Sequence, residues 1–163
     1  MKNQRAAFVH TRRERQRRRT KSLSQPKTFV MAIIEVSFGE YVGTVTGLFN
    51  FLEIVGGLVL FGLMCSIKEN THLNIFLFSV SYAFSFNGIH IMICSFFSRR
   101  TMEIMRQVFY YVFYQMTAAM SYVGASVKLV KDSPAVPVHA VVGIITGGLH
   151  FLHFITVSYN VYL

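Results

Sequence analysis

The sequence predicts an all-α integral membrane protein, an antiparallel four-helix bundle that follows a disordered basic N-terminal tail. Two observations predict this fold. Apolar residues make up 53% of the 163 residues and charged residues only 14%, whereas soluble domains carry about 25% charged residues. Four apolar stretches also follow one another, each long enough to cross a bilayer with about 20 residues. Such a composition excludes a soluble enzyme, a nucleic-acid-binding domain and a disordered chain.

Residues 1–27 form the predicted tail. They hold ten Lys and Arg residues and one acid, so the tail accounts for the whole net charge of +9 and residues 28–163 are balanced. The high pI therefore describes the tail and does not indicate nucleic-acid binding. A polybasic segment beside a membrane gains about 1 kcal/mol per basic residue from anionic lipid. The predicted lipid contacts are Arg12, Arg13, Arg15, Arg17, Arg18, Arg19 and Lys21.

Two further interpretations of the tail stay open. Thr20, Ser22 and Ser24 follow the basic run, and phosphorylation there would remove positive charge and act as an electrostatic switch. Arg15-Gln16-Arg17 is also similar to arginine-based retention signals of the early secretory pathway. The tail is thus a lipid-binding, a retention or a phospho-switch element.

The membrane-spanning helices are expected near 43–66, 73–97, 107–130 and 137–161, within a domain of residues 41–163. The stretches 70–98, 107–127 and 133–163 contain no Asp, Glu, Lys or Arg, and 41–67 contains only Glu53. Residues 28–40 mix apolar side chains with Glu35 and Glu40. This mixture favours a juxtamembrane, interfacial segment, either a short helix on the bilayer or a poorly ordered linker.

Short links predict that the spans run alternately up and down. The side that holds the tail collects thirteen Lys and Arg residues, and the other side collects three. By the positive-inside rule both termini are cytoplasmic, in the plasma membrane or in secretory-pathway vesicles. No signal peptide is expected. Cys65 and Cys94 fall on opposite membrane faces and cannot pair within one chain; Cys94, at the cytoplasmic end, is a candidate for palmitoylation.

Glu53 is the residue most suggestive of a function, because it lies near the bilayer midplane. A carboxylate at that depth is costly and usually faces other helices and a polar partner. Glu53 is either a proton- or ion-binding group or a hydrogen-bonded residue that fixes helix packing. The predicted intramembrane polar cluster consists of Glu53, Asn50, Asn87, His90, His150 and His153.

The spacing of His150 and His153 also suits a metal, but a single HxxH without a third ligand indicates none. The sequence predicts no cofactor, no metal and no catalytic residue.

Glycines at helical packing spacing predict close contacts between helices. They are Gly43, Gly47, Gly57, Gly143 and Gly147. The expected contact joins the first span to the fourth; the alternative is a lateral face that forms a homo-oligomer.

The first span, GLFNFLEIVGGLVLFGLMCS, resembles the first helix of the MARVEL-domain family, which includes the physins, the MAL and plasmolipin proteins, the membrane part of occludin and the chemokine-like-factor group. Four helices, short links and the size of residues 38–163 are similar too, and the compact form with a basic tail resembles the myoblast-fusion members of insects. The chain departs from members with large disulfide-bearing loops. The resemblance implies roles in vesicle trafficking, sterol-rich membrane domains and membrane apposition or fusion, and no catalytic residues.

The expected function is therefore that of a non-enzymatic multi-pass protein that organises membrane domains, vesicle trafficking or membrane fusion. Its expected partners are the lipid bilayer, including anionic and sterol-rich lipids, and other membrane proteins. The alternative is a small proton-coupled transporter or channel subunit that uses Glu53.

Overall fold

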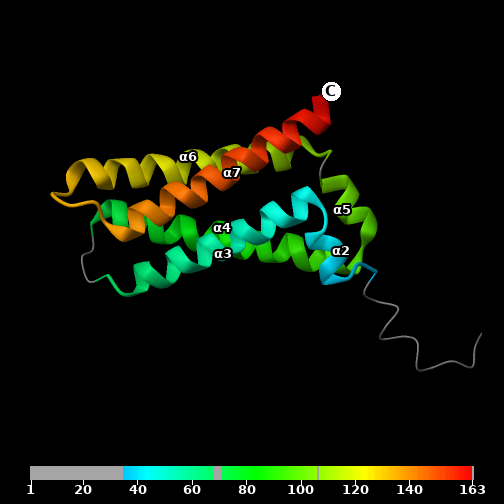
Figure 1. Cartoon of the computed structure of the whole chain (residues 1–163), viewed down its shortest axis with the longest axis horizontal. Coiled ribbons are helices and arrows are strands. Elements are labelled where there is room, and N and C mark those ends of the chain that lie inside the picture. Colours follow the sequence, from blue (N-terminus) through cyan, green and yellow to red (C-terminus); the bar gives the residue numbers. More distant parts are fainter. Residues whose placement is uncertain (1–34, 68–70, 106, 163) are drawn as a thin grey trace, which may run out of the picture. The chain divides into compact units, whose positions relative to one another are not determined.

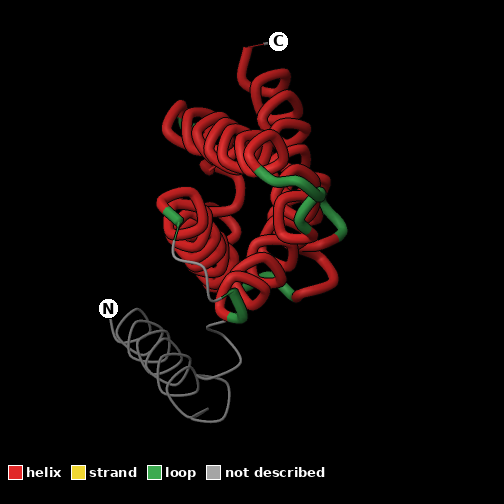
Figure 2. The backbone as a smooth tube through the Cα atoms, turned by 90° about the vertical axis from the view of Figure 1, so that its left-hand side faces the viewer, coloured by secondary structure: helices red, strands yellow, loops and turns green. Residues whose placement is uncertain are grey.

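The computed structural model describes residues 35–67, 71–105 and 107–162 (Figure 1). All regular structure within these ranges is α-helical, as the sequence predicts, and Figure 2 shows the helices without a strand among them. The helices are α2 (Phe38–Val42), α3 (Val45–Cys65), α4 (His72–Phe97), α5 (Arg99–Met105), α6 (Phe109–Asp132) and α7 (Val138–Tyr162). The predicted tail 1–27 and residues 28–34 of the predicted interfacial segment lie outside the described residues.

Three of these helices are long and apolar enough to cross a membrane, by length and composition. They are α3, α4 and residues Val138–Tyr159 of α7. Helix α6, which coincides with the span expected near 107–130, is as long as the others but less apolar. Its inward face carries Gln115, Ser126 and several tyrosines, and Lys128 and Lys131 lie close to its end. These polar groups reduce its mean hydropathy.

The long helices pack against one another in pairs, α3 with α4 and α7, and α6 with α7 and, less extensively, with α4 (Figure 1). The core between them divides into two clusters. The larger contains Leu60, Leu77 and Tyr122 from three different helices. The smaller is centred on Tyr111 and Val157. The polar residues described below lie on the same inward faces.

Glycines permit the close approaches, although not all where the sequence suggests. Gly57 lies against Ser85 of α4, and Gly47, in the first turn of α3, lies against the backbone of Tyr41 in α2. Gly143 and Gly147 lie mainly against α6, at Ser126 and Val123, and only Gly143 also reaches α3, at Leu60.

The contact between α3 and α7 instead runs through Gly56, where an added Cβ would come within 2.7 Å of Thr146 Oγ1. Gly43 is exposed and contacts only the backbone of α2. Each glycine that a neighbour crowds leaves no room for a side chain, which is the physical basis of small-residue packing.

The segment before α3 is attached to the end of α4. The backbone N–H groups of Glu35 and Val36 donate to the carbonyl oxygen of Phe96. Glu35 accepts from the backbone N–H of Arg99 at 2.9 Å, and the Arg99 guanidinium lies 2.7 Å from Glu40. Residues 35–42 are thereby held at the end of α4, beside the basic residues that begin α5.

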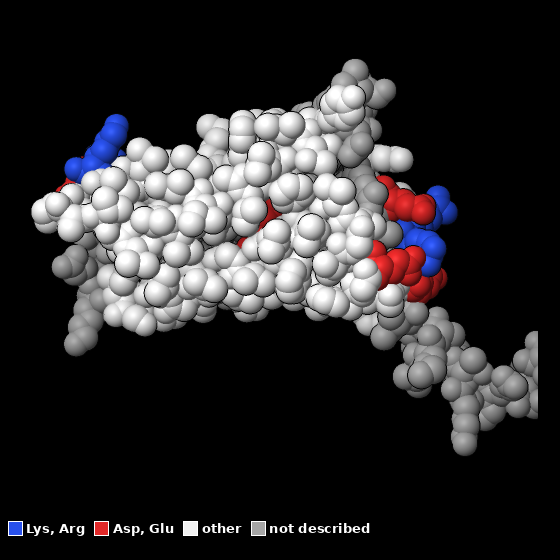
Figure 3. Space-filling model, viewed as in Figure 1, with Lys and Arg blue, Asp and Glu red and all other residues white. Residues whose placement is uncertain are grey.

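The exterior is apolar over its middle and charged at its ends. Figure 3 shows an uncharged band with one small acidic patch between two charged ends. Many large apolar side chains of the long helices are exposed, among them Val59, Phe76, Met120, Ile145 and Leu152. A surface of this kind is stable in hydrocarbon and unstable in water. Cys65 and Cys94 are both free and exposed.

Candidate functional site: a buried Glu–Gln–His cluster

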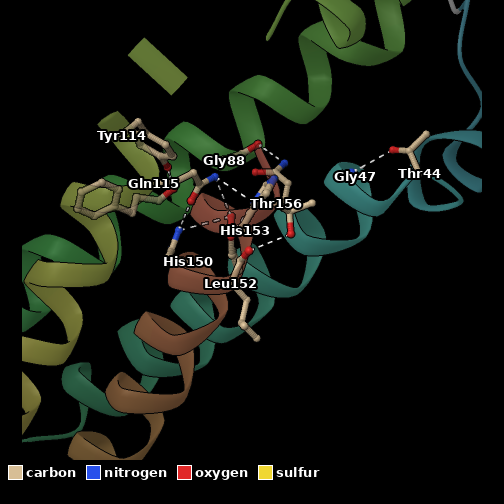
Figure 4. Close-up of polar contacts among 12 residues, drawn as sticks. Thr44, Gly47, Gly88, Tyr114, Gln115, His150, Leu152, His153 and Thr156 are labelled. Carbon is tan, nitrogen blue, oxygen red and sulfur yellow. Dashed lines mark hydrogen bonds and ion pairs between the residues drawn. The ribbon is translucent and has the colours of Figure 1, made fainter. Parts of the chain in front are cut away.

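Four buried polar residues from three helices converge in the core. Glu53 comes from α3, Gln115 from α6, and His150 and His153 from α7. Each is at most 4% exposed. Figure 4 shows the two histidines pointing from α7 toward Gln115. His150 and His153 share a helical face because residues three apart are neighbours on a helix surface.

The cluster is held together by direct hydrogen bonds. His153 Nδ1 lies 2.7 Å from Glu53 Oε1, and Gln115 Nε2 donates to Glu53 Oε2 at 3.3 Å. His150 Nδ1 lies 2.6 Å from Gln115 Oε1 and 3.5 Å from Glu53 Oε2. Because an amide oxygen only accepts, His150 carries its proton on Nδ1. The cluster thus joins α3, α6 and α7 at one point.

Charge balance limits the protonation of the cluster. With neutral imidazoles, an ionised Glu53 would leave a net charge of −1 among apolar groups, which costs several kcal/mol. The cluster becomes neutral when Glu53 and His153 share one further proton, as a carboxylic acid beside an imidazole or as a carboxylate beside an imidazolium. The 2.7 Å separation of Glu53 Oε1 and His153 Nδ1 suits both arrangements, and Gln115 Nε2, 3.1 Å from His153 Nδ1, can donate to it only in the first.

His153 Nε2 distinguishes this cluster from a fully paired one. It is buried and has no hydrogen-bond partner. The ring stacks on Phe49 and meets the edge of Tyr111, so aromatic groups surround it. Both neutral arrangements place a proton on Nε2, because Nδ1 then either accepts from Glu53 or is itself also protonated. Each neutral arrangement therefore has an unpaired N–H at this atom.

The other predicted members of the polar cluster lie elsewhere. Asn50 donates to Tyr41 Oη at 2.8 Å and to the carbonyl oxygen of Gly88 at 3.2 Å, which ties α2 and α3 to α4. Asn87 is half-buried and interacts with the hydroxyl of Tyr114. Neither contacts Glu53.

His90 lies on the outside of α4 and does not join the cluster. It is exposed, and its Nδ1 bonds to the carbonyl oxygen of Phe86 one turn back in the same helix. Sequence reasoning placed His90 at a suitable depth but could not place it on a face. A histidine satisfied by its own helix is compatible with a lipid-facing position.

Gln115 is the member that sequence reasoning missed. It is the one amide among the four residues, and it lies in the least apolar of the long helices. A usable signal exists, because residues 109–127 contain no other Asn, Gln, His or charged residue. A single amide in an apolar span is expected to form a hydrogen bond with a polar side chain on a facing helix.

The chemistry available at the cluster is hydrogen bonding and the binding of one proton. The described residues contain no group of three or more His, Cys, Asp or Glu side chains arranged to hold a metal ion. Both carboxylate oxygens of Glu53 instead form hydrogen bonds within the protein.

Comparisons of the chain with protein-family models, curated proteins and solved structures find no match. The resemblance of the first span to the MARVEL-domain family stays a prediction.

Proposed function

We propose that this protein is a non-enzymatic, four-span membrane scaffold that organises membrane domains and takes part in vesicle trafficking or membrane apposition and fusion. The observation that carries the proposal is the pairing of a self-contained polar core with an apolar exterior. Glu53, Gln115 and both cluster histidines bond to one another. The lipid-facing surface and the basic tail are then the parts of the chain that remain available to bind partners.

In this proposal α3, α4, α6 and α7 cross the bilayer in alternating directions as an antiparallel four-helix bundle. Helix α6 crosses with its polar groups turned inward, where Gln115 meets Glu53. The tail and helix α5 lie on the cytoplasmic side, because that side then collects most of the Lys and Arg residues. The MARVEL-like features of the first span support the same role.

The tail supplies membrane attraction and sorting, whereas the helices supply insertion. Replacing Arg15, Arg17, Arg18 and Arg19 with Gln is expected to leave the protein membrane-integrated and to change where it accumulates, because screened attraction to anionic lipid is lost. Carbonate extraction and imaging of the tagged protein measure the two effects. An unchanged distribution would contradict this role of the tail.

The proposed role itself is tested by what the protein binds in a membrane. The tagged full chain, solubilised in mild detergent, is expected to co-purify with vesicle or fusion components, and its depletion is expected to slow vesicle delivery or cell fusion. A depletion that leaves both processes at the wild-type rate would overturn the proposal.

A proton-coupled transporter or channel subunit is the second candidate, and one observation favours it. Glu53 Oε1 and His153 Nδ1 form a buried pair at 2.7 Å, and His153 Nε2 has no hydrogen-bond partner. Proton carriers in membranes are built from such acid and histidine groups.

Flux measurements separate the two candidates. Under the scaffold proposal, proteoliposomes with the wild-type chain and with Glu53→Gln take up protons at the same basal rate, measured with an internal pH dye under an imposed gradient. A wild-type flux that Glu53→Gln abolishes while the protein stays folded would establish the transporter instead, because an amide does not titrate.

A further inference from the structure

An apolar groove lies on the outer surface between α4 and α6, away from the Glu53 cluster. It is a shallow, open groove with a volume of about 410 Å³. Leu73 and Phe76 of α4 form one wall, and Met120 and Gly124 of α6 form the other. The two helices pack less extensively here than α6 packs on α7, which leaves the groove open.

The groove has an apolar floor and one cationic end. Lys128 lines it one turn before the end of α6, and Ser121 is its other polar side chain. The Lys128 ammonium group is exposed and lies 3.3 Å from Asp132 in a surface ion pair. Such pairs contribute little, so the ammonium group is free to exchange partners. Figure 3 shows basic side chains at this end of the molecule.

Leaving a groove of this composition empty is unfavourable in free energy. Its apolar lining would lose dispersion contacts, and water would find too few polar partners there. At the edge of a bilayer, the molecule that combines a long apolar chain with an anion at the level of a helix end is a phospholipid. A Lys side chain at that position reaches toward the headgroup layer.

We propose that the groove between α4 and α6 binds one phospholipid, with an acyl chain along Phe76 and Met120 and the phosphate on Lys128. Gly124 gives the chain its space, because a Cβ at that position would meet nothing within 4 Å. The proposal requires only that the chain lies in a membrane, and it is independent of the trafficking role.

The purified full-length protein offers matched controls for the test. Lys128→Gln removes the cation, and Lys131→Gln removes a neighbouring exposed cation outside the groove. Gly124→Phe fills the groove, and Gly62→Phe adds the same bulk to α3 at a position that is equally open. Helical content and thermal unfolding of each variant are measured first, and Lys128→Gln suffices if Gly124→Phe fails to fold.

Titration with phosphatidylglycerol in detergent, followed by native mass spectrometry, measures binding. Lys128→Gln is expected to weaken binding about fivefold, as the loss of one cation at a lipid headgroup implies, and Gly124→Phe is expected to weaken it at least as much. Lys131→Gln and Gly62→Phe leave it unchanged. Diacylglycerol with the same acyl chains is expected to bind more weakly and without dependence on Lys128.

Three outcomes would overturn the proposal. If Lys128→Gln and Lys131→Gln weakened phosphatidylglycerol binding equally, the lipid would be attracted by the overall positive charge of this end and not by Lys128. If Gly124→Phe and Gly62→Phe weakened phosphatidylglycerol binding equally, lipid would bind all around the protein and not in the groove. Binding that depends on Gly124 but not on Lys128, with cholesterol as effective as phosphatidylglycerol, would show a sterol in the groove.

Discussion

Glu53→Leu is expected to destabilise the folded protein strongly. Leucine removes both carboxylate oxygens, so His153 Nδ1 and Gln115 Nε2 lose their hydrogen bonds to Glu53 and keep only their contact with each other at 3.1 Å. The loss of a buried hydrogen-bond partner costs about 1–3 kcal/mol. Thermal unfolding of the purified protein in one detergent, followed by circular dichroism, measures the loss as a lowered Tm.

Glu53→Gln is the matched control for this prediction. Its amide NH₂ can donate to His153 Nδ1 while its oxygen accepts from Gln115 Nε2, as a protonated Glu53 would. Its Tm is expected to stay close to that of the wild type. If Glu53→Leu unfolded at the wild-type temperature, the cluster would contribute nothing to stability, and the scaffold role of Glu53 would be wrong.

Gly147→Val is also expected to destabilise the protein, because it overfills the contact between α6 and α7. A Cβ at Gly147 would lie 2.7 Å from Val123 Cγ2 and 3.1 Å from the backbone nitrogen of Val123. The backbone cannot yield as a flexible side chain would. Overpacking of this kind costs about 1–3 kcal/mol, again measured as a lowered Tm.

Gly148→Val controls for the intrinsic helix preference of valine, because it makes the same change one residue later. A Cβ at Gly148 would meet nothing within 4 Å, so its Tm is expected to change little. Equal losses in the two variants would show that helix propensity, and not the contact with Val123, decides the result.

The helices could be predicted from the sequence because their signals are local. The gap between Glu69 and Arg99 in the charge pattern predicts one long helix, and α4 occupies most of it. The caps are equally local: Thr44 Oγ1 accepts from Gly47 at the start of α3, and Thr71 does the same for Asn74 at α4.

The candidate site could be predicted only in part, because it depends on how helices are rotated against one another. Glu53 is a single acid deep in an apolar helix, and such an acid needs a partner on another helix. His150 and His153 could be proposed on depth alone. Asn50, at a similar depth on the same helix as Glu53, instead bonds to Tyr41 and Gly88, and no pattern in the sequence distinguishes the two cases.

The interhelical contacts of the glycines illustrate the same limit. Gly143 and Gly147 have the spacing of a packing motif, but spacing does not name the partner helix. They lie against α6, whereas Gly56 makes the close contact with α7. Helix rotation is fixed by the sum of side-chain contacts across the core, including Tyr122 and Leu60, and this sum is not a local property of the sequence.

In the proposed arrangement four helices cross the bilayer, with α6 as one of them and its polar side chains turned toward Glu53. The sidedness of the two termini tests this most directly, since an even number of crossings places both on one side and three crossings place them on opposite sides. The measurement uses one epitope before Met1 and another after Leu163, detected in intact cells and after selective permeabilisation of the plasma membrane. Both epitopes are expected to be cytoplasmic; a cytoplasmic N-terminal epitope with a C-terminal epitope on the opposite side would contradict the four-span arrangement.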